Sequence, residues 1–196
     1  MRERLAANQA AAEATAEVAA GGGGSAGGAA LAELGVDEAR TMSASELLSH
    51  VDALKTAATA RFSSGEHERA CAQYEQAQRL LNVLPAGLSE AEAKRLHTLK
   101  LALHLNRAAC ELRATRHEGA LAQCDAALEL SPGSTKALFR RAQALGGLGR
   151  LTEAIEAYIQ VLAIEPTSRQ AHEGLRGVRE RLAAAQGQGQ GQSGGA

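Results

Sequence analysis

Small, apolar and proline positions in the second half of the chain recur at a fixed interval. The pairs Ala108 and Ala142, Ala120 and Ala154, Leu128 and Leu162, Leu130 and Ile164, and Pro132 and Pro166 are each 34 residues apart. An internal repeat of this length, with small residues at fixed points and a closing proline, predicts a unit of two packed helices. The Ala side chains let the two helices approach closely. Each Pro ends a helix, because it has no amide hydrogen and its ring excludes the preceding turn.

A third copy of the pattern lies upstream, and an insertion follows it. Its positions are Ala58, Gly65, Ala70, Tyr74 and Ala77, but Ala70 and Ala120 are 50 residues apart, so 16 residues have been added to the 34-residue interval. The added stretch contains a breaker, Leu84-Pro85-Ala86-Gly87, and then Ser89-Glu90-Ala91-Glu92, which is a typical helix start with acids in its first turn. We therefore predict a long helix from about Ser89 to Arg113.

The last apolar pattern before the C-terminus predicts a capping helix. Ala171, Leu175, Val178 and Leu182 are spaced four, three and four residues apart, which places them on one helix face. A repeat array needs such a cap, because its last unit otherwise exposes the surface that it would offer to a neighbour. Gly174 and Gly177 each weaken this helix by about 1 kcal/mol relative to Ala.

The predicted fold is all-α: a right-handed superhelical solenoid of the tetratricopeptide (TPR) type, with three helix-turn-helix repeats and a C-terminal capping helix. We expect seven helices and no strand over residues 44–185. The expected divisions are repeat 1 at about 51–84, an insert at 85–100, repeat 2 at about 101–134, repeat 3 at about 135–168 and the cap at about 168–185. The Ala- and Gly-rich segment 1–43 and the Gly- and Gln-rich segment 186–196 are predicted to be largely disordered.

Composition narrows the classes of function. The formal net charge of −1 argues against a dedicated nucleic-acid binder. The three cysteines lack C-x-x-C spacing and lie in helical patterns, which favours reduced core thiols in a cytoplasmic protein; they are Cys71, Cys110 and Cys124. No apolar run approaches the length of a membrane span, so we expect no membrane insertion.

Motifs for metal or catalytic chemistry are missing. His-Glu occurs three times, but a zinc-protease helix needs a second His four residues after the first, and those positions hold Cys71, Leu121 and Arg176. The chain also has no G-x-x-x-x-G-K-[ST] phosphate-binding loop. We therefore expect no enzyme activity, no metal site and no cofactor.

The groove lined by the first helix of each repeat is the candidate site. Lys55 and Thr59 are four apart on the first of these helices, Lys136 and Arg140 are four apart on the third, and Asn106 precedes Arg140 by 34 residues. Four-residue spacing puts each pair on one helix face. Cations and an amide donor that converge from three helices suit a compact anion, and a C-terminal Asp presents two carboxylates on one residue.

These residues resemble a known site. Lys55, Asn106, Lys136 and Arg140 match four of the five positions of the dicarboxylate clamp in TPR co-chaperones. The stretches 106–110 and 136–144, with the inserted connection, look most like the C-terminal repeat domain of the large immunophilins, and the likeness covers about residues 47–182. The resemblance implies binding of the Glu-Glu-Val-Asp tail of the ninety-kilodalton heat-shock chaperone, with the seventy-kilodalton chaperone as a possible partner. Thr59 departs from the family pattern, which has Asn.

Other interpretations of the same residues stay open. The charges could form a solvated helix face, which accounts for most Lys and Arg residues on a repeat protein. The groove could belong to a generic scaffold that binds another peptide. The chain could also be a non-catalytic relative of a peptidyl-prolyl isomerase that contains TPR repeats, because the stretch before Ala44 has no strand signal for an isomerase sheet. We expect a monomer in each case.

Overall fold

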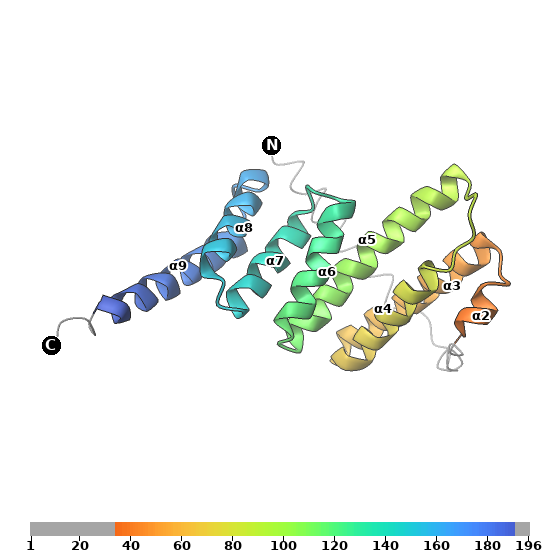
Figure 1. The fold of residues 1–196 in the computed structure, drawn as a ribbon, viewed down its shortest axis with the longest axis horizontal. Coiled ribbons are helices and arrows are strands. Elements are labelled where there is room, and N and C mark those ends of the chain that lie inside the picture. Colours follow the sequence, from red (N-terminus) through yellow and green to blue (C-terminus); the bar gives the residue numbers. More distant parts are fainter. Residues whose placement is uncertain (1–33, 191–196) are drawn as a thin grey trace, which may run out of the picture. The chain divides into compact units, whose positions relative to one another are not determined.

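The structure, a computed structural model, describes residues 34–190. Most of the segment 1–43 and residues 191–196, both predicted to be disordered, lie outside the described residues. Every regular element from residue 34 to residue 190 is a helix, which confirms the all-α prediction (Figure 1). The helices are α2 (Val36–Ala39), α3 (Ala44–Ser63), α4 (His67–Leu81), α5 (Glu90–Arg113), α6 (His117–Leu130), α7 (Thr135–Gly147), α8 (Leu151–Ile164) and α9 (Arg169–Gln190).

The helices pack as repeated pairs. Helix α3 packs on α4, α5 on α6 and α7 on α8, and each pair also contacts the helix that follows it. The first helices of the pairs form a row of their own, in which α3 contacts α5, α5 contacts α7 and α7 contacts the capping helix α9. The alanines that define the 34-residue period are fully buried at 0% exposure; they are Ala108, Ala120, Ala142 and Ala154. Close packing at these points explains why the repeat retains small side chains.

Both long helices of the first two repeats begin at a serine cap. Ser43 caps α3 together with Glu46, and Ser89 caps α5 together with Glu92. In each pair the serine hydroxyl accepts the backbone N–H of the glutamate at 3.3 Å, and the carboxylate accepts the backbone N–H of the serine at 2.9 Å. This reciprocal cap satisfies two backbone donors and fixes the start of each helix. The long helix predicted from Ser89 is confirmed.

The ends of the array differ from the predicted bounds. Residues 36–39, inside the segment predicted to be largely disordered, form helix α2, and its Ala39 is buried and packs toward α4. Helix α9 ends at Gln190 instead of about residue 185. Gln is a good helix former, and isolated Gly residues lower the stability of an established helix without ending it.

Two glycines of α9 have opposite surroundings, which predicts opposite effects of substitution. A Cβ atom at Gly174 would overlap the ring of Tyr158, whereas nothing lies within 4 Å of a Cβ atom at Gly177. We expect Gly174→Ala to lower the free energy of unfolding by about 1–3 kcal/mol through overpacking. Gly177→Ala should raise it by about 0.5–1 kcal/mol, because Ala is the better helix former. Urea denaturation of the two variants checks this, and a Gly174→Ala variant as stable as Gly177→Ala would contradict it.

The three cysteines are buried and unpaired, as predicted. Cys110 and Cys124 are fully buried and Cys71 is 6% exposed. Burial raises the pKa of the Cys110 and Cys124 thiols to about 12. Within residues 34–190, none of the helices combines the length and the apolar character needed to cross a membrane.

Candidate functional site

The predicted groove is hollowed beside helix α7. Two cavities of about 360 and 500 Å³ adjoin there, because both are lined by Arg140 and Gln143. The smaller cavity extends toward α8 and α9 and also contains Lys136 and Phe139. The larger one extends toward the first two repeats; its other lining residues are Phe62, Ala109, Leu112, Arg113 and His117. The groove therefore combines cations with aromatic and aliphatic surface, which suits a peptide.

Thr59, one of the five predicted site residues, contacts a buried tyrosine hydroxyl, and Asn106 and Arg140 influence the pKa of the same hydroxyl. Thr59 Oγ1 lies 2.8 Å from the hydroxyl of Tyr74, a residue of α4 that is only 1% exposed. Burial raises the pKa of Tyr74, while the side chains of Thr59 and Asn106 and the positive charge of Arg140 partly offset this rise. These three residues come from α3, α5 and α7. Of the five predicted site residues, Lys136 and Arg140 line the two cavities, and Lys55, Thr59 and Asn106 are not among the lining residues.

Arg140 is fixed in place by the backbone of the neighbouring repeat. Its Nη1 donates to the carbonyl oxygen of Leu105 at 2.7 Å, directly beside Asn106 on α5. Burial lowers the pKa of Arg140, although an arginine with so high a starting pKa stays charged. No carboxylate of residues 34–190 pairs with Arg140 or with Lys136, whereas many of the other arginines there form ion pairs; examples are Arg116, Arg141, Arg150 and Arg169. Lys136 and Arg140 therefore lack an ion-pair partner within that part of the chain, and the residue of opposite charge in the lining of their cavity is Glu165.

The two predicted lysines differ in their surroundings. Lys136 is exposed and lies in the smaller cavity. Lys55 Nζ pairs with Asp52 at 2.7 Å, and the two side chains are 28% and 45% exposed. A surface pair of this kind contributes at most about 1 kcal/mol, so a ligand carboxylate could replace Asp52 at little cost.

The structure adds residues to the site that sequence reasoning missed. Asp52 could have been found, because it precedes Lys55 by three residues on one helix face. Tyr74 could not, because its place in the repeat indicates only packing. Gln143 and Phe62 also line the groove without any sequence signal of their own.

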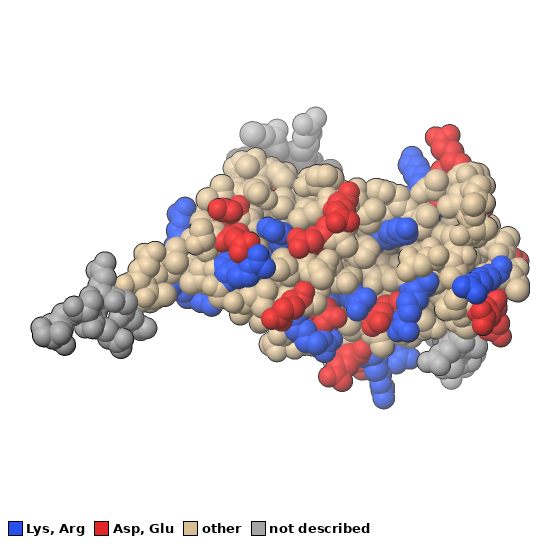
Figure 2. Space-filling model, viewed as in Figure 1, with Lys and Arg blue, Asp and Glu red and all other residues tan. Residues whose placement is uncertain are grey.

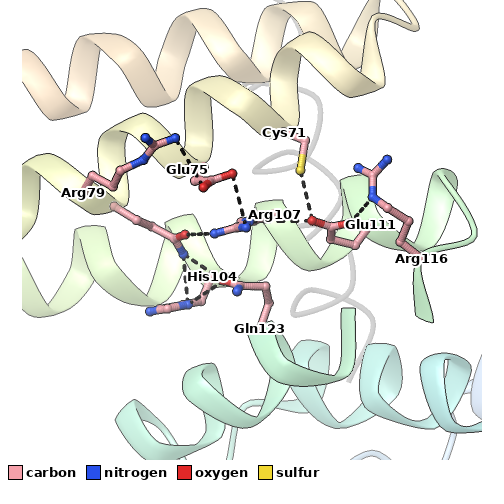
Figure 3. A network of polar contacts seen from close by, with 9 residues as sticks. Cys71, Glu75, Arg79, His104, Arg107, Glu111, Arg116 and Gln123 are labelled. Atoms are coloured by element: carbon pink, nitrogen blue, oxygen red, sulfur yellow. Dashed lines mark hydrogen bonds and ion pairs between the residues drawn. The ribbon is translucent and has the colours of Figure 1, made fainter. Parts of the chain in front are cut away.

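A polar network behind the groove joins α4, α5 and α6 (Figure 3). Arg107, the neighbour of Asn106, donates to Gln78 at 2.8 Å and pairs with Glu75 at 3.4 Å. Gln78 in turn donates to Gln123 of α6 at 2.9 Å. These contacts fix the rotation of α5 relative to its neighbours and hence the direction in which Asn106 points.

Glu111 is the one buried charged residue of the described part, and it closes the same network (Figure 3). Its carboxylate accepts from Arg116 Nε and from Cys71 Sγ at 3.2 Å, and Arg107 Nε lies 3.7 Å away. Burial alone would raise the pKa of Glu111, but the hydrogen bonds from Arg116 and Cys71 and the two positive charges hold it below its ordinary value. Glu111 is therefore ionised at neutral pH.

Charges of both signs are interspersed over the face shown in Figure 2. Several ion pairs of residues 34–190 join neighbours close in sequence, such as Arg150 with Glu153 at 2.6 Å and Arg169 with Glu173 at 2.8 Å. This face lacks the basic stripe that a nucleic-acid binder would present.

Comparison with known proteins places the repeats in a family. A tetratricopeptide-repeat model matches residues 111–177. The chain is 31% identical over 144 residues to peptidyl-prolyl cis-trans isomerase FKBP4 of Mus musculus, a match that covers 74% of this chain and 31% of that protein. It is 40% identical over 118 residues to the FK506-binding protein-like protein of Homo sapiens, covering 60% of this chain and 31% of that protein. The chain thus matches about a third of the length of these relatives.

Solved structures with the same fold include TPR domains with bound peptides. The C-terminal TPR-containing domain of a Plasmodium falciparum FK506-binding protein superposes with a TM-score of 0.71 at 17% identity, covering 76% of this chain and 98% of that one. The first TPR of Spaghetti (RPAP3), bound to the HSP90 peptide SRMEEVD, superposes with a TM-score of 0.57 at 26% identity, covering 68% of this chain and 93% of that one. The second TPR domain of human RPAP3, in complex with the HSP70 peptide SGPTIEEVD, superposes with a TM-score of 0.52 at 28% identity, covering 64% of this chain and 92% of that one. Residues 34–190 therefore form a tetratricopeptide-repeat domain, and in sequence this domain is similar to that of the FK506-binding immunophilins.

Proposed function

We propose that this chain is a cytoplasmic, monomeric adaptor of the co-chaperone type that binds the C-terminal Glu-Glu-Val-Asp tail of heat-shock chaperones. The observation that carries the proposal is that Arg140 and Lys136 line a cavity without an ion-pair partner among residues 34–190, and that this cavity adjoins a second one toward the first two repeats. The peptides bound to the two RPAP3 domains end in Glu-Glu-Val-Asp, which supports the same class of ligand. Of the two chaperones, we favour the ninety-kilodalton one.

The five residues have different roles in this proposal. Arg140 and Lys136 supply unpaired positive charge for the ligand carboxylates, and a charge-assisted hydrogen bond contributes about 1.5–3 kcal/mol. Lys55 exchanges its surface partner Asp52 for a carboxylate of the ligand. Asn106 supplies an amide that can donate and accept. Thr59 contacts the peptide from α3, the helix that also carries Lys55.

A titration of the full chain with a Glu-Glu-Val-Asp peptide and with its C-terminally amidated twin tests the proposal. Amidation removes one negative charge and leaves the side chains unchanged, so the twin should bind at least tenfold more weakly. Equal affinity for the two peptides would mean that the terminal carboxylate is not recognised and would favour a scaffold for another peptide. Absence of binding to both would reject the tail as a ligand.

Substitution of Thr59 by the residue of the family pattern predicts a gain in affinity. Thr59→Asn supplies an amide with two N–H donors, whereas the single hydrogen of the hydroxyl is donated to the carbonyl oxygen of Lys55, so we expect tail binding to strengthen by about 1 kcal/mol, the usual net contribution of one hydrogen bond. Isothermal titration calorimetry measures this change. Thr98→Asn is the matched control, because Thr98 is exposed on α5 and its hydroxyl, like that of Thr59, donates to the carbonyl four residues earlier. An unchanged or lower affinity of Thr59→Asn would show that the groove does not use the family geometry.

A further inference from the structure

The hydroxyl of Thr59 has two hydrogen-bond partners, and their chemistry determines its role. Thr59 Oγ1 lies 2.8 Å from the carbonyl oxygen of Lys55 and 2.8 Å from the hydroxyl of Tyr74. A hydroxyl has one hydrogen, and a carbonyl oxygen can only accept. Thr59 must therefore donate its hydrogen to Lys55, and the hydrogen shared with Tyr74 must come from Tyr74. Thr59 has no hydrogen left for a ligand.

The Tyr74 hydroxyl is well placed to hold this arrangement. Tyr74 is 1% exposed, so water does not compete for its hydrogen. Burial raises its pKa, which keeps the hydroxyl protonated. The Asn106 side chain also acts on Tyr74, since it favours a lower pKa of the hydroxyl. Tyr74 is thus the hydrogen-bond partner that holds Thr59 from the neighbouring helix α4.

The lone pair that remains on the Thr59 hydroxyl oxygen limits what this residue can recognise. Thr59 is exposed, so its remaining lone pair is open to a ligand, but only as an acceptor. Ionised carboxylates are acceptors only, so Thr59 cannot bond to the carboxylates of an acidic tail. The donors that the backbone of such a tail offers are its N–H groups. We infer that Tyr74 is a positioning residue that fixes Thr59 as a hydrogen-bond acceptor, and that Thr59 thereby recognises a backbone N–H of the bound tail; the second half of this inference rests on the proposed function.

The hydroxyl pair can be tested without any peptide. Tyr74→Phe removes the donor and Thr59→Val removes the acceptor while keeping the shape. We expect Tyr74→Phe to lower the urea midpoint of the full wild-type chain. In the Thr59→Val background, Tyr74→Phe should leave the urea midpoint unchanged or raise it, because the buried Tyr74 hydroxyl has lost its acceptor there and is itself destabilising. An equal fall in both backgrounds would overturn the assignment of the hydrogens. Tyr158→Phe is the matched control, since Tyr158 is also buried but its hydroxyl is not a partner of Thr59.

Ester peptides test the recognition of the backbone N–H. In a set of Glu-Glu-Val-Asp peptides, one backbone amide at a time is replaced by an ester, which removes the N–H donor and preserves the shape. We expect one ester peptide to bind the wild-type chain about three- to tenfold more weakly than the amide peptide, the loss of one hydrogen bond. The Thr59→Val variant should bind this ester peptide and the amide peptide equally. Tyr74→Phe should weaken binding of the amide peptide when residue 59 is Thr. It should have no such effect in the Thr59→Val background.

Each outcome of the two experiments decides a separate question. The same ester penalty in wild type and Thr59→Val, or no ester penalty at all, would overturn the role of Thr59 even if the tail binds well. If the wild-type chain binds no tail peptide, the proposed function is wrong and the recognition of a tail N–H falls with it. The urea experiment would still decide whether Tyr74 donates to Thr59.

Discussion

Lys136→Ala and Arg140→Ala should each weaken binding of a Glu-Glu-Val-Asp peptide tenfold or more. Both cations line the smaller cavity, and neither forms an ion pair with a carboxylate of residues 34–190, so each is available to a ligand carboxylate. Charge-assisted hydrogen bonds contribute about 1.5–3 kcal/mol each, while a micromolar peptide has only about −8 kcal/mol in total. Binding should also weaken as salt rises, because part of the site is open to solvent. Calorimetry at two ionic strengths measures both effects.

The two variants differ in how cleanly they test the site. Lys136 is exposed, so its removal should leave stability unchanged. Arg140 also bonds to the Leu105 carbonyl across the repeats, so Arg140→Ala should lose about 1 kcal/mol of stability as well. Arg179→Ala, an exposed change outside the lining of both cavities, is the control and should bind as wild type. Wild-type affinity of both groove variants, with intact circular dichroism, would reject the clamp.

Glu111→Ala should lower the free energy of unfolding by about 2–4 kcal/mol. The carboxylate is 8% exposed and is held by Arg116, Arg107 and Cys71. Removal of one partner of a buried ion pair costs about 3–5 kcal/mol. We expect a smaller loss here because the Arg116 side chain is 46% exposed, so water can solvate its charge after Glu111 is removed. Urea denaturation at neutral pH measures the change. Glu118→Ala, an exposed acid on α6, is the matched control and should stay within about 0.5 kcal/mol of wild type.

The difference between wild type and Glu111→Ala should depend on pH. The pKa of Glu111 is lowered in the folded state, so its contribution to stability is fully present above the pKa of an unfolded glutamate, about 4.3. This contribution should be lost as the pH falls through the lower folded pKa. A stability difference that stays constant down to about pH 2 would show that Glu111 stabilises by packing rather than by charge.

Much of the fold could be predicted from the sequence because one physical rule repeats. Close helix packing demands Ala at Ala108 and again at Ala142, and a signal that recurs is hard to mistake for chance. The inserted helix was predictable for a local reason, since Ser89 and Glu92 form a cap within four residues. The end of α9 was not, because a Gln and Gly sequence lies close to the balance between helix and coil.

The membership of the candidate site remains a prediction, and its hydrogen bonds could not be predicted from the sequence. Spacing predicted that Thr59, Asn106 and Arg140 lie on helix faces toward one groove, and of the five residues the structure places Lys136 and Arg140 in the lining of a cavity. Spacing alone could not show that Lys55 is paired with Asp52, or that the Thr59 hydroxyl is already committed to two partners. Those facts depend on side-chain rotamers and on contacts between helices, such as the one with Tyr74, that no single helix pattern encodes.

The three buried cysteines allow local opening of this domain to be measured by the rate at which their thiols react. Thiol reagents attack the thiolate, and burial both hides Cys71, Cys110 and Cys124 and raises their pKa. Alkylation of each thiol therefore has to wait for the helices around it to open, and its rate measures how often they do. Cys71 lies on α4, Cys110 on α5 and Cys124 on α6, so mass spectrometry of the three sites can follow the first two repeats separately. The natural sequence thus allows the cooperativity of the array to be measured without an added label.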